Sequence, residues 1–100
     1  MFYVYFLQSL KNGKVYTGNS SKNPQQRLTE HNQGSNKWTK NNGPFKLVYY
    51  ETYHCKTDAI AREKFYKTGF GKTVKASIIN SIAQFRPKTD QPVAEVRAFR

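Results

Sequence analysis

The dipeptide Asn12-Gly13 joins two short runs of aromatic and β-branched residues, and this arrangement restricts the fold more than any other feature of the chain. One run, from Phe2 to Leu10, precedes the dipeptide, and the other, from Val15 to Asn19, follows it. Asn-Gly between two such runs is the strongest short-range signal for a β-hairpin. The sequence therefore predicts two antiparallel strands at the start of the chain.

The position of the turn also predicts how the strands align. A two-residue turn at Asn12-Gly13 would place Tyr16 opposite Ser9. Because strand side chains alternate between faces, Ser9 shares a face with Tyr5, so both tyrosines are expected on one face of the sheet. In this alignment they are about 13 Å apart along the strand. Sheet twist or another register would then be needed to bring them into one site.

Helix and strand signals continue after the hairpin. Asn23 followed by Pro24 indicates an N-cap and the first residue of a helix that ends near Gly34. Residues 35–44 form a polar loop in this interpretation. Phe45 to Tyr53 then has the alternation of a third strand.

Two further helices are expected. Thr57 is predicted to cap a helix that continues to about Thr68, where Gly69-Phe70-Gly71 breaks it. The last helix is expected from Thr73 to about Phe85. The chain is thus predicted to be an α+β domain of order β-β-α-β-α-α over residues 1–85, followed by a loosely held tail over residues 86–100.

The charge of the chain favours a polyanionic partner. Its 17 Lys and Arg residues against 6 Asp and Glu give a net charge of +11, and nucleic acid is the commonest polyanion. A membrane surface is the weaker alternative, because the chain has no long basic amphipathic helix.

Cys55 is the only cysteine, which excludes an internal disulfide and a cysteine-rich zinc site. Without a signal peptide or a membrane-spanning run, the protein is predicted to be cytoplasmic.

Arg27 and His31 are four residues apart, which places them on one face of the first predicted helix. The planar guanidinium of Arg27 matches two phosphate oxygens, although an interior salt bridge is an equal alternative. His31 could carry a proton or donate to phosphate, or it could only cover neighbouring groups. A tyrosine such as Tyr5 or Tyr16 needs a nearby cation before its phenol can act as a base.

Glu63 shares a largely apolar helix face and therefore requires a partner. Lys67 is one candidate, Arg27 is another, and a divalent cation is the third. One carboxylate together with water and substrate phosphate suffices for Mg²⁺, which retains much of its hydration shell. Trp38 could stack on a nucleic-acid base or pack on the sheet.

Taken in chain order, these residues resemble the GIY-YIG nuclease superfamily, in particular its small stand-alone bacterial branch, which is similar to the N-terminal nuclease domain of the UvrC repair subunit. The resemblance covers about residues 2 to 80. It rests on Tyr3-Val4-Tyr5, Tyr16-Thr17-Gly18, Arg27-x-x-x-His31-Asn32, Thr39-Lys40, Pro44, Leu47-Val48-Tyr49-Tyr50, Ala59, Arg62-Glu63 and Lys67-Thr68-Gly69.

The resemblance implies a three-stranded antiparallel sheet with flanking helices and a DNA endonuclease that acts in repair or recombination. It implies that Tyr5 or Tyr16 activates or orients the attacking water, that Arg27 stabilises the phosphate and that His31 is an accessory residue. Glu63 becomes the only ligand of one Mg²⁺ or Mn²⁺ ion. We expect these five side chains to converge on one positively charged surface. The family's downstream asparagine has no secure counterpart here.

Nucleic acid, and DNA in particular, is the predicted partner. The alternative is a non-catalytic nucleic-acid-binding module on the same scaffold, and a third possibility is a protein-interaction domain whose basic surface meets an acidic partner. The residues expected to contact nucleic acid are Lys37, Trp38, Lys40, Lys67, Lys72 and Lys75.

Overall fold

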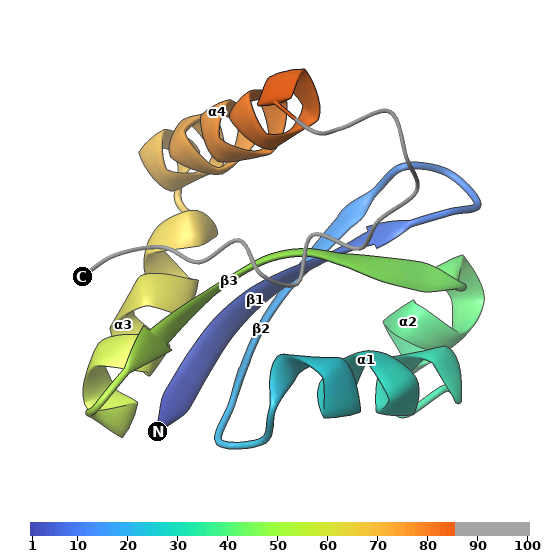
Figure 1. Cartoon of the computed structure of the whole chain (residues 1–100), viewed down its shortest axis with the longest axis horizontal. Helices are drawn as coiled ribbons and strands as arrows, with labels where there is room; N and C mark the ends of the chain where they lie inside the picture. The colour runs from blue at the N-terminus through green and yellow to red at the C-terminus, as the bar shows by residue number, and fades with distance from the viewer. Residues whose placement is uncertain (86–100) are drawn as a thin grey trace.

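The computed structural model describes residues 1–85, and the tail predicted for residues 86–100 lies outside the described residues (Figure 1). The predicted α+β class and the order β-β-α-β-α-α are confirmed, with one additional short helix, α2, before the third strand. The elements are β1 (Phe2–Ser9), β2 (Val15–Ser20), α1 (Pro24–Asn32), α2 (Lys37–Asn42), β3 (Phe45–Tyr53), α3 (Lys56–Tyr66) and α4 (Gly69–Phe85).

The three strands form one antiparallel sheet in the order β2-β1-β3, so β1 lies in the centre. Helices α1 and α2 lie on one side of the sheet, and α3 and α4 lie on the other (Figure 1). The sheet with flanking helices is therefore as expected. Because β1 is central, its residues from Tyr3 to Gln8 lie between two other strands.

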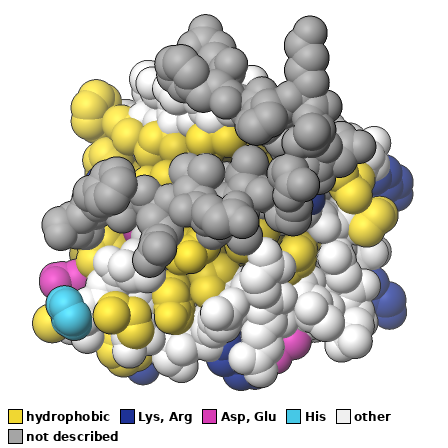
Figure 2. Space-filling view, in the orientation of Figure 1, with side chains coloured by type: hydrophobic (Ala, Val, Ile, Leu, Met, Phe, Trp, Pro, Cys, Tyr) yellow, Lys and Arg dark blue, Asp and Glu magenta, His cyan; other side chains and the backbone are white. Residues whose placement is uncertain are grey.

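Alternate residues of β1 point into two separate apolar cores. Val4 and Phe6 pack toward α3 and α4, whereas Tyr5 and Leu7 pack toward α1. Hydrophobic side chains gather along α4, and Lys and Arg side chains lie nearer the edges of the visible face (Figure 2). Burial of each large apolar side chain contributes about 1.5–3 kcal/mol. Both cores therefore hold β1 in place.

The hairpin register differs from the prediction. Tyr16 lies opposite Leu7 and not opposite Ser9, because the turn holds four residues. The backbone of Ser9 bonds to Lys14 (2.8 Å) and Gly13 (3.0 Å), and the Ser9 hydroxyl accepts further backbone N–H groups within the turn. Tyr5 and Tyr16 are thus two positions apart, about 7 Å along the strand.

The prediction of a polar loop over residues 35–44 is wrong, because α2 occupies the centre of this segment. Asn36 caps this helix by accepting a hydrogen bond of 2.8 Å from the backbone N–H of Thr39. The ring of Trp38 lies between those of Tyr16 (centroids 5.6 Å apart) and Phe45 (5.7 Å). Tertiary packing of one aromatic residue thus supports a helix that has no apolar periodicity.

The boundaries of α3 and α4 also differ from expectation. Cys55, not Thr57, is the N-cap residue of α3, and it makes no side-chain capping bond. The segment Gly69-Phe70-Gly71 does not separate the helices by a long break but forms the first turn of α4. Gly71 permits this tight connection, because a Cβ atom there would lie 1.7 Å from the carbonyl oxygen of Phe65.

Candidate active site

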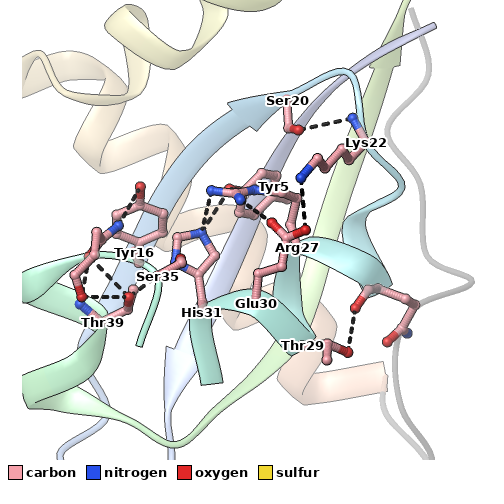
Figure 3. Close-up of polar contacts among 12 residues, drawn as sticks. Tyr5, Tyr16, Ser20, Lys22, Arg27, Thr29, Glu30, His31, Ser35 and Thr39 are labelled. Atoms are coloured by element: carbon pink, nitrogen blue, oxygen red, sulfur yellow. Dashed lines mark hydrogen bonds and ion pairs between the residues drawn. The ribbon is translucent and has the colours of Figure 1, made fainter. Parts of the chain in front are cut away.

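The hydroxyl group of Tyr5 lies at the centre of a hydrogen-bond network between β1 and α1 (Figure 3). Tyr5 is 1% exposed. Its oxygen lies 3.0 Å from Nε2 of His31 and accepts a hydrogen bond of 3.4 Å from Nε of Arg27. Because Arg27 and His31 are one turn apart, a single face of α1 presents both side chains to the phenol.

His31 is 1% exposed and uses both ring nitrogens. Nε2 also lies 3.2 Å from Nη2 of Arg27, and Nδ1 lies 3.1 Å from Oγ1 of Thr39. Since arginine only donates, Nε2 accepts and Nδ1 carries the hydrogen. Burial, and secondarily the charge of Arg27, lowers the pKa of His31 to about 4, with Glu30 acting in the opposite direction. His31 is therefore neutral at pH 7 and accepts a hydrogen bond from Tyr5.

The lowered pKa predicts a pH-dependent stability. The pKa of His31 is about 4 when folded and 6.5 when unfolded, so the unfolded chain binds the proton more readily between these values. The contribution is full above pH 6.5 and is lost as pH falls toward 4. We expect wild type to lose about 2 kcal/mol more unfolding free energy than His31→Gln between pH 7 and pH 5. Urea unfolding of both proteins at the two pH values measures this difference. Equal losses would contradict the buried, neutral state of His31.

Arg27 is held by contacts from all three of its nitrogen atoms. Nε donates to Tyr5, Nη2 contacts His31, and Nη1 forms an ion pair with Glu30. Glu30 also pairs with Lys22 at 2.8 Å. The guanidinium therefore has a fixed orientation beside the phenol, and its side chain remains 22% exposed.

Tyr16 joins the network through its ring. The ring centroid lies 4.8 Å from that of His31 and 6.4 Å from that of Tyr5. Its hydroxyl accepts a hydrogen bond of 3.4 Å from Asn36, the residue that caps α2. Gly18 leaves the space that the two rings need, because a Cβ atom there would lie 2.6 Å from the Tyr5 hydroxyl. The glycine of the Tyr-Thr-Gly triplet is thus a packing requirement of the site.

Glu63 approaches from α3, on the other side of the sheet. Its side chain is 17% exposed and forms an ion pair of 2.7 Å with Lys67. It also accepts a hydrogen bond from the side-chain amide of Asn19, which directly follows Gly18 on the edge strand β2. Of the partners considered from the sequence, Lys67 is present, whereas Arg27 pairs with Glu30 instead.

The electrostatics of Tyr5 link it to Glu63. Burial raises the pKa of the Tyr5 phenol most strongly, and Arg27 opposes this effect. The charges of Tyr16 and Glu63 raise this pKa further, so the carboxylate lies within electrostatic reach of the phenol. Tyr5, Tyr16, Arg27 and His31 thus form one contact network, and Glu63 lies at the neighbouring sheet edge without touching them.

The residues expected to contact nucleic acid lie in two regions. Lys37 and Lys40 are exposed on α2, where Trp38 is 37% exposed beside Tyr16. The other region, near α4, contains Lys67, Lys72 and Lys75. Lys67 and Lys72 are exposed, whereas the ammonium group of Lys75 lies 3.4 Å from the carbonyl oxygen of Val15 and 5.5 Å from the Phe6 ring.

Sequence reasoning missed the polar residues that orient the site. Thr39, Asn36 and Asn19 carry no charge and were not among the predicted site residues, although Thr39 is one of the residues on which the family resemblance rests. The pattern of Asn36 followed three residues later by Thr39 is a helix-start signal that could have identified α2 and, through it, the partner of His31. No comparable signal marks Asn19.

A second polar cluster surrounds Glu51 on the α3 side of the sheet. Glu51 is 0% exposed. Its carboxylate accepts hydrogen bonds from the hydroxyls of Tyr49, Tyr53 and Tyr66 and from Nε of Arg62. The cluster therefore connects β3 to α3, the helix that carries Glu63.

Metal binding at Glu63 would rest on few protein ligands. Within residues 1–85, no three His, Cys, Asp or Glu side chains gather as a potential metal cluster. Glu63 offers a carboxylate, and the amide group of Asn19 adjoins it. The Asn19 amide presents its nitrogen to Glu63, so the carboxylate is the oxygen donor here. A carboxylate suits Mg²⁺, which keeps several waters. Among the helices of the described part of the chain, none is long and apolar enough to cross a membrane.

Comparison with known proteins identifies the family of the chain. The family model described as the GIY-YIG catalytic domain matches residues 1–76. The UPF0213 protein SSP2268 of Staphylococcus saprophyticus is 37% identical over 79 residues, which cover 78% of this chain and 93% of that protein. The UPF0213 protein CPE1444 of Clostridium perfringens is 41% identical over 68 residues, covering 67% and 71%.

The chain belongs to the GIY-YIG catalytic-domain family. Its relatives include short bacterial proteins, since the alignment spans nearly all of the Staphylococcus saprophyticus protein. The predicted resemblance to this small branch is thus confirmed. No solved structure matches the chain.

Proposed function

We propose that this protein is an endonuclease that hydrolyses DNA phosphodiesters with one Mg²⁺ or Mn²⁺ ion, in DNA repair or recombination. The observation that carries the proposal is the Tyr5 hydroxyl held between Arg27 and a neutral His31, beside the edge strand β2 that Glu63 also contacts. The family model supports a catalytic domain.

Arg27 is the residue that stabilises charge in this proposal. Its guanidinium is fixed by three contacts yet remains partly exposed. A fixed cationic donor costs no reorganisation when negative charge develops on the phosphate in the transition state. Its position beside Tyr5 supports a phosphate site over the two tyrosines.

We assign the water-facing role to Tyr16. Tyr5 is almost fully buried and its hydroxyl bonds to His31 and Arg27, whereas Tyr16 is only half-buried. The Tyr16 hydroxyl would orient a water molecule for attack on phosphorus as the bond from phosphorus to the leaving oxygen breaks. Tyr5 and His31 would hold the Tyr16 ring in place by ring contacts and Arg27 by hydrogen bonds.

Glu63 would hold the metal ion through its carboxylate oxygens. A divalent ion at this site supplies electrostatic stabilisation of the phosphate oxygens. The ion pair with Lys67 presently balances the carboxylate. Lys67 has a side chain that is 59% exposed, so it can turn to a DNA phosphate when another cation occupies its place.

The lysines of the folded part of the chain would bind the DNA backbone. Residues 1–80 contain 13 Lys and Arg against 4 Asp and Glu, a net charge of +9. Trp38, whose ring lies beside that of Tyr16, would contact a base near the cleaved bond. Lys37 and Lys40 on the same short helix, and Lys67, Lys72 and Lys75 near α4, supply positive charge on either side.

Incubation with single-stranded, duplex, flapped and branched DNA tests the proposal. We expect nicking with Mg²⁺ or Mn²⁺ and none in EDTA. We also expect the affinity of the protein for DNA to fall steeply as the salt concentration rises, because phosphate contacts release counterions. Salt-sensitive binding without nicking on any substrate would indicate the non-catalytic module. Affinity that is equal at low and physiological salt would contradict nucleic-acid binding altogether.

A further inference from the structure

The connection between α3 and α4 carries an aromatic side chain that the proposed chemistry does not use. Phe70 is 72% exposed, more than any other large hydrophobic side chain of residues 1–83, whose side chains the structure describes. Exposure of a phenylalanine to this extent forgoes about 1.5–3 kcal/mol of burial. A partner that covers the ring would recover that free energy.

The local backbone fixes Phe70 in this exposed position. Gly71 packs against α3 so closely that no side chain fits, and its N–H donates to the Thr68 hydroxyl at 3.0 Å. Gly69, in contrast, has nothing within 4 Å of where a Cβ atom would lie. The ring of Phe65 contacts that of Phe70 edge to face, with centroids 5.9 Å apart. Phe70 is thus supported on one side and open on the other.

The surrounding charge is uniformly positive. Residues 64–75, here called the α3–α4 corner, contain four lysines and no acidic residue. Lys67 and Lys72 both lower the pKa of Lys75, after the larger effect of its burial, so the three ammonium groups lie within electrostatic reach of one another. Lys67 also contacts Glu63 directly. The α3–α4 corner therefore adjoins the candidate metal ligand.

We propose that the α3–α4 corner binds an unpaired nucleotide of the DNA, with its base stacked on Phe70 and its flanking phosphates on Lys67 and Lys72. An exposed ring bordered by lysines is complementary to a base bordered by phosphates. Within a continuous duplex the faces of the bases are covered by their neighbours, so Phe70 selects DNA with an unpaired base. This inference rests on the proposed function only in requiring that the protein binds DNA.

The test measures binding in EDTA, where cleavage plays no part. A single strand carrying one 2-aminopurine is titrated with wild type, Phe70→Ala, Phe70→Leu and Phe70→Tyr. Wild type and Phe70→Tyr should quench the 2-aminopurine fluorescence and bind alike. Phe70→Ala should bind about 5- to 150-fold more weakly. Phe70→Leu should also lose the quenching, because it keeps apolar bulk without an aromatic face.

Two controls make the result specific. A blunt duplex of the same length should bind wild type and Phe70→Ala with similar affinity. Leu10→Ala, which removes another exposed apolar side chain (60% exposed) in the hairpin turn, should leave single-strand binding unchanged.

Unaltered single-strand binding by Phe70→Ala would overturn the inference, as would an equal loss on the blunt duplex or self-association that disappears in Phe70→Ala. If Phe70-dependent quenching occurs but no substrate is ever nicked, the proposed function fails while this inference stands.

Discussion

Glu63→Ala is expected to abolish metal-dependent nicking while DNA binding stays at or slightly above the wild-type affinity. Within residues 1–85 no cluster of three His, Cys, Asp or Glu side chains could hold the ion in place of Glu63, and removing this carboxylate also deletes a negative charge near phosphate. Glu63→Gln should behave alike, because a neutral amide keeps the shape but not the charge that holds a hard cation. Nicking rates at saturating DNA and binding in EDTA measure the two effects.

Melting temperature separates this role from that of an ordinary ion pair. Lys67 is largely exposed, so its pair with Glu63 contributes about 1 kcal/mol or less. Lys67→Ala breaks the same pair and measures its stability contribution alone. Asp58→Ala, which removes an exposed carboxylate from the start of α3, should nick DNA as wild type does. Undiminished nicking by Glu63→Ala would end the one-metal mechanism.

Arg27→Ala is expected to slow nicking about 10²- to 10³-fold with a much smaller loss of DNA affinity. The reason is that the fixed guanidinium is aimed at charge that builds up in the transition state. Arg27→Lys should not restore the rate, because one ammonium group cannot replace three nitrogens that contact Tyr5, Glu30 and His31. Single-turnover nicking and equilibrium binding distinguish rate from affinity.

The same variant should change a second observable. The charge of Arg27 contributes to the low pKa of His31, so Arg27→Ala should raise that pKa from about 4, as followed by NMR titration of the imidazole. Lys22→Ala is the matched control, because Lys22 pairs with Glu30 but contacts neither Tyr5 nor His31. A loss of rate in Lys22→Ala equal to that in Arg27→Ala would assign the effect to general charge.

Local signals predicted the strands and the first helix well. The Asn23-Pro24 start of α1 and the bounds of β3 agree with the structure, because caps and alternation are encoded within a few residues. The predicted register of the hairpin differs from the observed one by two positions. The Ser9 hydroxyl and the Asn12 side chain satisfy the backbone of a longer turn, and propensity for a two-residue turn does not include such bonds.

The site was predictable where spacing along one element decides it. Arg27 and His31 share a helix face by their four-residue separation alone. The partners that define the chemistry are not encoded locally: Thr39 reaches His31 from α2, and Asn19 reaches Glu63 across 44 positions of the chain. The neutral state of His31 follows from burial, which depends on the packing of several elements at once.

The Glu51 cluster determines how α3 is oriented about its own axis. Arg62 and Tyr66 bind Glu51 from this helix, and Glu63 is the next residue after Arg62. Any rotation of α3 that would swing Glu63 away from β2 must break both bonds to a carboxylate that has no access to water. Loss of activity in a mutational scan therefore cannot by itself identify residues that touch DNA. Substitutions at Glu51 or Tyr66 would misdirect Glu63 while every residue of the site remains unchanged.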